Sequence, residues 1–183
     1  VYEPYATPDW VKNGVIYQIF PDRFRKAGEA VVGEGKVLHE SWDELPVYLP
    51  DENGKVKNND FFGGNFKGIE EKLPYLADLG VTAVYLNPVF EAASNHRYDT
   101  GDYDKFDGML GTEADFASLV AAAEKFGIKL IPDGVFNHTG SDSVYFNKYG
   151  RYPSLGAYQS ENSPYFKWYN FISFPDSYAS WWG

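Results

Sequence analysis

Three short apolar runs, separated by two segments with helical patterning, constrain the fold of this chain most strongly. The runs cover residues 15–20, 81–86 and 128–131. They are rich in β-branched residues and leucine and show little polar alternation, which is typical of strands buried on both faces of a parallel sheet. The order strand, helix, strand, helix, strand predicts consecutive βα units with right-handed crossovers.

The two helical segments also carry recognisable end signals. In the first, from Gly68 to Leu79, apolar residues recur on one face and Gly80 ends the element. These apolar residues are Ile69, Leu73, Leu76 and Leu79. The second opens with Thr112 and Asp115, which are spaced as in a capping box, and ends at Gly127. Its predicted inward face consists of Phe116, Leu119, Val120 and Ala123.

Two tracts lack any sustained helical or strand periodicity of apolar residues. Residues 25–60 are polar and contain several Gly and Glu, so we interpret them as an inserted loop; loops of this length are usually functional or mobile. Residues 139–183 are dominated by Tyr, Trp, Phe, Ser, Pro and Asn. We expect them to form part of an irregular inserted domain, with most of the aromatic residues packed inside it. The predicted division is therefore 1–138, including the 25–60 insertion, and 139–183.

Composition narrows the class of ligand. The chain has 16 Lys and Arg against 26 Asp and Glu, a formal charge of −10, which argues against nucleic acid as a partner because phosphate contacts need a basic face. No apolar run approaches the roughly eighteen residues that a membrane span requires. Aromatic residues make up 19% of the chain. Exposed aromatic rings stack on the apolar faces of sugar rings, so this excess favours a carbohydrate ligand.

Polar residues follow the third apolar run closely. Asp133, Asn137 and His138 supply a carboxylate, an amide and an imidazole, which suit hydroxyl groups or an oxygen-binding cation. Satisfied hydrogen bonds within a loop would explain the same residues. A doubly wound domain with a nucleotide ligand would need a Gly-rich phosphate turn, and Gly63-Gly64 is not one. A non-catalytic glycan-binding module would explain the aromatic residues but not the βα order.

Several motifs together resemble the α-amylase superfamily of glycoside hydrolases. Residues 15–24 are similar to its first barrel strand, and residues 59–65, 94–103 and 133–138 match further motifs in the same order. The Asn-His-Arg-Tyr-Asp-Thr string at 95–100 is most similar to the neopullulanase, cyclomaltodextrinase and amylopullulanase branch. The resemblance implies an α/β fold. It would be the N-terminal portion, about three βα units, of a TIM (β/α)8 catalytic barrel, with an irregular subdomain inserted after strand three.

The resemblance also implies roles for individual residues. Tyr98 matches a tyrosine that stacks under the sugar beside the cleaved bond, and His96 and His138 match histidines that hydrogen-bond its hydroxyls. Asp133 matches an aspartate that orders the site. Asn137 matches an asparagine that binds a structural calcium ion in many relatives, which implies Ca²⁺ as a cofactor.

One further calcium motif of this branch is altered here. The loop after the first strand often carries an Asn/Asp-rich calcium site, which an aspartate after the Gly-Gly pair completes. In this chain Asn65 stands at that position, and residues 25–32 contribute only Glu29. Asp60 and the Asn58-Asn59 pair remain as candidate ligands for a weak site.

Retaining glycosidases need two carboxyl groups about 5–5.5 Å apart, one as nucleophile and one as acid/base. In this family they follow the fourth and fifth strands, and a further essential aspartate follows the seventh. No residue here matches them, so we expect no catalytic residue in this chain and no activity from it alone. We also expect its strand edges to be covered by the rest of a parent barrel or by self-association.

The implied parent is a retaining hydrolase of α-1,4 glucosidic bonds, or of both α-1,4 and α-1,6 bonds, in starch, pullulan or maltooligosaccharides. A glucan transferase or branching enzyme of the same superfamily is the alternative. An amylopullulanase-like parent would be extracellular and a cyclomaltodextrinase-like one cytoplasmic; the sequence leaves bond specificity, compartment and oligomeric state open.

Overall fold

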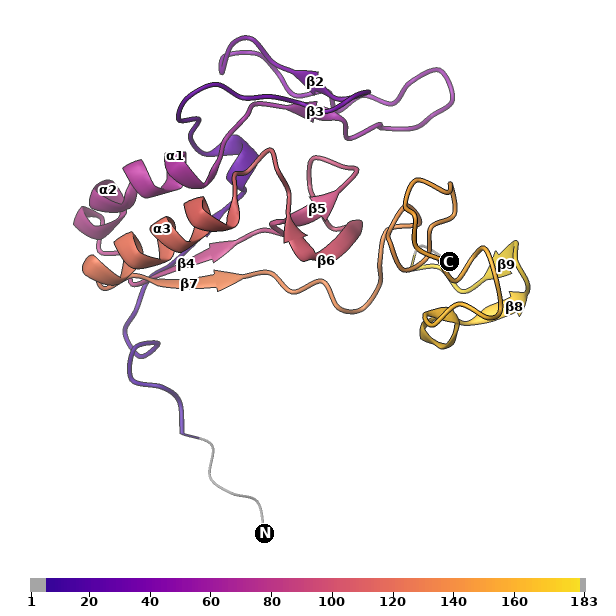
Figure 1. Cartoon of the computed structure of the whole chain (residues 1–183). Coiled ribbons are helices and arrows are strands. Elements are labelled where there is room, and N and C mark those ends of the chain that lie inside the picture. The colour runs from indigo at the N-terminus through magenta and orange to yellow at the C-terminus, as the bar shows by residue number, and fades with distance from the viewer. Residues whose placement is uncertain (1–5, 182–183) are drawn as a thin grey trace.

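A three-stranded parallel sheet lies at the centre of the fold. The computed structural model describes residues 6–181, and its sheet contains β1 (Ile16–Ile19), β4 (Ala83–Leu86) and β7 (Lys129–Pro132) in the order β1-β4-β7 (Figure 1). Ile16 pairs with Ala83, and Ala83 pairs with Lys129, so the three strands run in register. The predicted parallel sheet with two crossovers is confirmed; β1 and β4 are shorter than their apolar runs, and β7 is shifted by one residue from its run.

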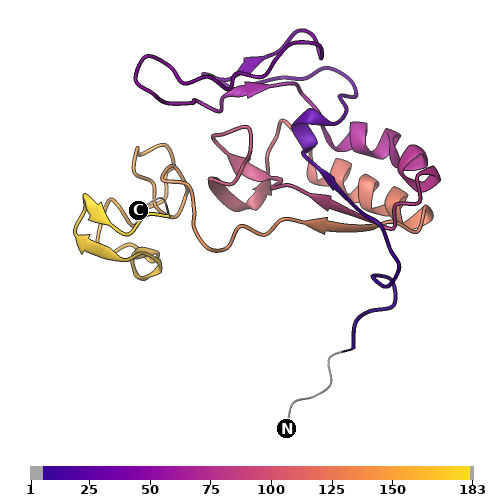
Figure 2. The same ribbon diagram turned by 180° about the vertical axis from the view of Figure 1, so that it is seen from behind.

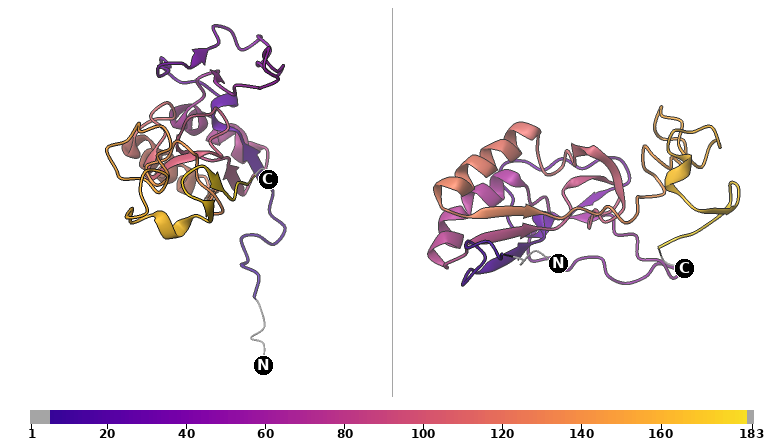
Figure 3. Two further views of the ribbon diagram at one scale, coloured as in Figure 1. Left: turned by 90° about the vertical axis from the view of Figure 1, so that its right-hand side faces the viewer. Right: turned by 90° about the horizontal axis from the view of Figure 1, so that it is seen from below.

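Three helices pack on one face of this sheet. They are α1 (Phe66–Glu71), α2 (Leu73–Asp78) and α3 (Glu113–Lys125), and all lie on the same side of the strands in Figures 1 and 3. Apolar side chains form the core between the layers. Its buried members include Ile19, Ile69, Leu73, Leu76, Val84, Leu86, Leu119, Ala123 and Ile128. The three strands and their helices therefore share one hydrophobic layer, as consecutive βα units of a barrel do.

The first helical segment differs from the prediction of one helix over 68–79. The structure contains two helices that meet at Lys72, because Pro74 has no N–H to bond to the carbonyl of Glu70. Leu79 follows α2 and is 54% exposed, so its predicted core position is wrong. Leu79 is the C-cap residue of α2, so it lies at the end of the helix rather than on its buried face. The spacing of apolar residues did not indicate where the helix ends.

The second helix follows its predicted signals closely. Thr112 accepts a hydrogen bond from the Asp115 amide at 3.2 Å, and Asp115 accepts one from the Thr112 amide at 2.9 Å, which completes the capping box. Leu119 and Ala123 are buried, but Val120 is 43% exposed, so Val120 was wrongly assigned to the core. One residue along a helix is a rotation of about 100°, which carries Val120 away from the buried stripe.

The tract at 25–60 is largely irregular, as expected. It contains the short strand β2 (Val37–Leu38), which pairs in parallel with β3 (Asp60–Phe61). A 3₁₀ turn, η1 (Pro21–Arg23), leads into the tract from β1. At its other end, a Cβ on Gly64 would overlap the carbonyl oxygen of Pro21. Glycine at this position lets the start of α1 approach the end of the first strand closely.

The segment after β4 contains an antiparallel hairpin that the sequence analysis did not predict. Its strands are β5 (Phe90–Ala92) and β6 (Thr100–Phe106), visible from behind in Figure 2. The pairing shifts register twice. Because these shifts break the period of two that marks a strand in sequence, the hairpin has no clear sequence signal.

The tail consists of turns around a cluster of aromatic rings. It contains the 3₁₀ helix η2 (Phe166–Trp168) and the strands β8 (Phe171–Ser173) and β9 (Ser177–Tyr178). The Phe146 ring lies 4.8 Å from that of Tyr169 and 4.9 Å from that of Tyr178, so aromatic residues do form its interior. In Figures 1 and 2 this tail lies beyond the carboxyl end of β7.

The boundaries 1–138, 25–60 and 139–183 stay predictions, and residues 1–5 and 182–183 lie outside the described part of the chain. Within residues 6–181, β1 and β7 form the two edges of the main sheet. No helix in that part of the chain is long and apolar enough to cross a membrane.

Candidate functional site

The residues that follow the three parallel strands meet at one end of the sheet. The ladder continues past the strands, because the amide of Asn87 donates to Ile19 at 2.9 Å and that of Asp133 donates to Leu86 at 2.9 Å. Asp133 therefore lies directly beside the end of β4. In barrels of this architecture, the carboxyl end of the strands carries the ligand site.

Two tyrosine phenols interact with the Asp133 carboxylate. They belong to Tyr85, on β4, and Tyr98, in the segment after it. Burial and then the contact with Asp133 raise the pKa of both phenols, that of Tyr98 to about 12. Both phenols thus stay protonated as donors. Sequence reasoning missed Tyr85, although the alternation of a strand could have suggested that its side chain lies opposite those of its buried neighbours.

The segment from Ser94 to Asp99 forms a closed turn that orients His96. The amide of Tyr98 donates to Nδ1 of His96 at 3.1 Å, and the Ser94 hydroxyl lies 3.0 Å from the same nitrogen while donating to Asp99. Since Nδ1 accepts a backbone proton, neutral His96 carries its own proton on Nε2. Burial lowers the pKa of His96, and the positive charge of Arg97 lowers it further. The negative charge of Asp99 raises the pKa but does not outweigh these two effects. The Nε2–H of His96 is therefore a neutral hydrogen-bond donor.

His138 links the end of β7 to this turn. Its Nε2 donates to the Tyr98 carbonyl at 3.0 Å, and the amide of Asn137 lies 3.4 Å from its Nδ1. The indole of Trp181 stacks on its ring at 5.5 Å with an interplanar angle of 13°. The Tyr103 hydroxyl lies 2.9 Å from the carbonyl of His138. In this arrangement, His138 holds the two loops together through its Nε2.

His96, Tyr98 and His138 line one cleft of about 920 Å³ between these loops and the tail. Phe136, Trp168 and Trp181 line it too and are each at least 60% exposed. Asp133 does not line the cleft but interacts with the phenol of Tyr98, which does. The sugar-binding roles of these four residues stay predictions. Trp181 was not predicted as a site residue, because nothing in the sequence of the tail separates lining rings from packed ones.

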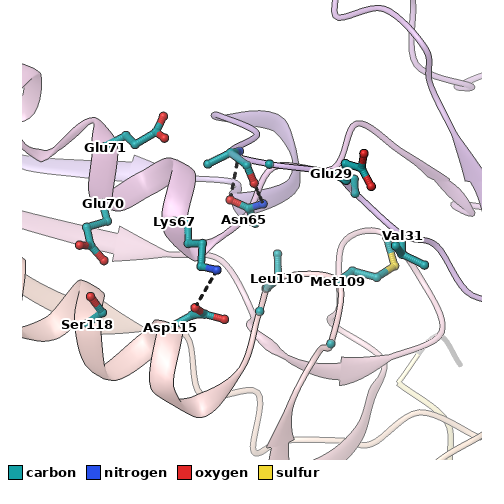
Figure 4. A pocket seen from close by; sticks show the side chains of 15 residues that line it. Glu29, Val31, Asn65, Lys67, Glu70, Glu71, Met109, Leu110, Asp115 and Ser118 are labelled. Atoms are coloured by element: carbon teal, nitrogen blue, oxygen red, sulfur yellow. Dashed lines mark hydrogen bonds and ion pairs between the residues drawn. The ribbon is translucent and has the colours of Figure 1, made fainter.

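A second pocket of about 740 Å³ lies between the inserted tract and the N-terminal ends of α1 and α3 (Figure 4). Lys67 and Asp115 pair across it at 3.3 Å. None of the predicted sugar-binding residues lines it, so the cleft at the strand ends is the candidate site.

Asn65 and Asp60 do not fit a calcium site. Asn65 caps α1 by accepting from Gly68 at 2.8 Å, and its amide donates to the Ala27 carbonyl at 2.8 Å. The Asp60 carboxylate accepts from His39 at 3.0 Å and from Arg23 at 3.3 Å, so protein cations already neutralise it. These contacts leave neither Asn65 nor Asp60 available as a ligand for a cation in the loop after β1.

Asn137 offers one exposed amide oxygen at the end of the sheet. Within residues 6–181, no group of three or more His, Cys, Asp or Glu could hold a metal ion. A calcium ion takes six to eight oxygen ligands, so Asn137 alone could not hold it. Calcium at Asn137 stays a prediction that would require further oxygen ligands.

Comparison with known proteins gives the same family as the motifs. Residues 18–180 match the family model described as alpha amylase, catalytic domain. An amylopullulanase of Thermoanaerobacterium saccharolyticum is 48% identical over 200 residues, and neopullulanase 2 of Thermoactinomyces vulgaris is 37% identical over 178. These alignments cover 98% and 97% of this chain, but only 16% and 27% of the two relatives.

A solved structure shows a similar fold. It is the cyclic α-maltosyl-(1→6)-maltose hydrolase of Arthrobacter globiformis in complex with cyclic α-maltosyl-(1→6)-maltose, at a TM-score of 0.77 and 34% identity. The similarity covers 96% of this chain and 37% of the hydrolase. These matches place the described sheet among the first strands of TIM-barrel enzymes, and the chain belongs to the α-amylase family of glycoside hydrolases.

Proposed function

We propose that this chain forms the first part of the active-site barrel of a retaining α-glucan hydrolase. Its cleft would bind the glucose unit beside the scissile bond. The observation that carries the proposal is the meeting of His96, Tyr98 and His138 in one cleft at the carboxyl end of a parallel sheet. The names of the relatives, amylopullulanase and neopullulanase, support α-glucans as the substrate class.

The geometry gives each residue a distinct part in this proposal. The phenol of Tyr98 interacts with Asp133 and its backbone carbonyl accepts from His138, and 37% of the residue stays exposed. A fixed, exposed ring is suited to stacking on a pyranose. His96 offers a neutral Nε2–H, which can donate to a sugar hydroxyl at any pH above its lowered pKa. His138 fixes the Tyr98 backbone through its bond to that carbonyl.

Asp133 acts as a supporting residue in this proposal rather than as the nucleophile. Its carboxylate interacts with the phenols of Tyr85 and Tyr98, of which Tyr98 lines the cleft. The nucleophile and the acid/base would come from later strands of the barrel. The same wall serves α-1,4 and α-1,6 bonds equally well, because the sugar beside the scissile bond is a glucose in both. A transferase of the same family would use it too.

Binding of maltotriose to the chain tests the proposal without requiring turnover. Tryptophan fluorescence should change on titration, because Trp168 and Trp181 line the cleft. Tyr98→Ala should weaken this binding at least tenfold. Tyr75→Ala, which removes a 54% exposed ring from α2, is the matched control and should leave it unchanged. Equal binding by both variants, or a response that cellotriose also produces, would argue against the assignment.

A further inference from the structure

Arg97 lies between the two cleft residues His96 and Tyr98, but its own side chain is buried on the opposite side of the turn. The residue is 1% exposed, and its backbone has a φ of 60°, a conformation that L-residues rarely adopt. At that φ the chain reverses direction sharply. His96 and Tyr98 line the cleft, whereas Arg97 does not.

The guanidinium of Arg97 is held by two groups at once. Its Nε donates to the Asp107 carboxylate at 2.6 Å, and its Nη1 donates to the Asn95 carbonyl at 3.0 Å. Asp107 is 4% exposed and is itself fixed, since its amide donates to Val89 at 2.9 Å and its other oxygen accepts from Met109 at 2.9 Å. The ion pair is therefore anchored to the core beneath the hairpin.

Asn95 attaches the same turn to a second buried carboxylate. Its side-chain amide donates to Oδ1 of Asp60 at 3.0 Å and to the Asp60 carbonyl at 3.1 Å. On the cleft side, the amide of Arg97 donates to the Ser94 hydroxyl at 3.1 Å, and that hydroxyl borders Nδ1 of His96. A connected set of contacts thus runs from Asp107 through Arg97 to the Ser94 hydroxyl, which lies beside the imidazole of His96.

We propose that Arg97, paired with Asp107, is a positioning residue that sets the orientation and tautomer of His96 and the orientation of Tyr98. The inference rests on the proposed sugar-binding role of those two residues. With the guanidinium held, the turn keeps Nδ1 of His96 against the Tyr98 amide and directs Nε2–H to the substrate. Without it, the turn relaxes and His96 takes up other hydrogen bonds.

A double substitution separates this role from simple stabilisation. Arg97→Met or Asp107→Leu alone leaves one buried charge unpaired and should lower Tm strongly. The double variant replaces the ion pair with apolar groups and should recover most of that Tm. If Arg97 only stabilised the fold, activity would recover together with Tm. If it positions the turn, the folded double variant should keep a kcat/KM at least tenfold below the unsubstituted enzyme on maltooligosaccharides.

Imidazole ¹⁵N spectra give a readout that does not depend on turnover. The unsubstituted protein should show His96 with its proton on Nε2 and with a lowered pKa, and the double variant should show mixed tautomers and a pKa nearer 6.5. The control is Arg25→Met with Glu71→Leu, which removes a half-exposed ion pair of 3.1 Å from α1. This control should change neither the spectrum nor kcat/KM.

These experiments test the positioning role of Arg97 and the proposed function independently of each other. An unchanged His96 spectrum, or full kcat/KM in the folded double variant of the complete enzyme, overturns the inference. If the unsubstituted complete enzyme does not act on α-glucans, the proposed function fails and the His96 spectra alone decide the positioning role. If the double variant does not fold, Arg97→Lys replaces it. This variant keeps the charge but loses the fork that reaches both acceptors, so kcat/KM should fall at least threefold, and no change would overturn the inference.

Discussion

Replacing Asp60 with asparagine should destabilise the protein more than replacing any exposed carboxylate. Asp60 is 1% exposed, and its Oδ2 accepts from His39 at 3.0 Å, from the Val47 amide at 3.0 Å and from Arg23 at 3.3 Å. Hydrogen bonds to charged groups contribute about 1.5–3 kcal/mol each. Loss of the charge weakens two of them, so the expected cost is about 3 kcal/mol, or roughly 6–12 °C in Tm.

The cost should depend on pH in a defined direction. Burial raises the pKa of Asp60, but the bonds from His39, Val47 and Arg23 outweigh it and hold the pKa below 3.8. The hydrogen bond to Glu44 is the largest effect on the pKa of His39 and raises it. Burial lowers this pKa, but the bonds to Glu44 and Asp60 together outweigh burial and hold the pKa above 6.5. The Asp60 contribution is present above 3.8 and is lost as pH falls through its lowered pKa. The His39 contribution is complete below 6.5 and is lost as pH rises through its raised pKa.

Thermal unfolding of Asp60→Asn at about pH 5.5 and about pH 9 tests both statements. The loss in Tm should be larger at the lower pH, where both partners are charged. Asp104→Asn, at an exposed position of β6, is the control and should shift Tm by less than about 2 °C at either pH. A loss for Asp60→Asn as small as that of the control, or one that grows toward high pH, would refute the reasoning.

Three further predictions concern packing, activity and edges. Leu119→Ala, at a fully buried site, should cost about 2–5 kcal/mol by urea unfolding, whereas Val120→Ala beside it should cost under about 1 kcal/mol; equal costs would contradict the assigned helix face. The chain alone should not hydrolyse a chromogenic maltooligosaccharide, and turnover abolished by Asp133→Asn would show that the chemistry has been misplaced. Light scattering should show self-association, because β1 and β7 leave edges; a compact monomer with a cooperative, high-temperature melt would argue against this.

The order of elements could be predicted from sequence because its signals are local. Apolar runs and the Thr112–Asp115 capping box act over a few residues and depend little on the rest of the chain. The break before Pro74 was missed because apolar spacing continues through it as if the helix were unbroken. The β5–β6 hairpin was missed because its register shifts remove the alternation that would have marked it.

In the candidate site too, the sequence identified some residues but not the contacts between them. The resemblance singled out His96, Tyr98 and His138, and the structure brings them to one cleft. Sequence does not show that Asp60 bonds to Asn95, 35 residues away, or that Tyr85 reaches Asp133. Such contacts depend on how strands and loops meet in three dimensions. For this reason Asp60 was considered as a calcium ligand, although its neighbours are His39 and Arg23.

The most direct test of the central claim is the kcat/KM of the complete enzyme carrying Tyr98→Ala. The account predicts a loss of more than about tenfold on maltooligosaccharides, on the order of 1.4 kcal/mol or more, because stacking should strengthen as the sugar flattens toward its transition state. Tyr75→Ala should retain the original value. Wild-type kinetics in a folded Tyr98→Ala enzyme would contradict the assignment of this cleft as the site beside the cleaved bond.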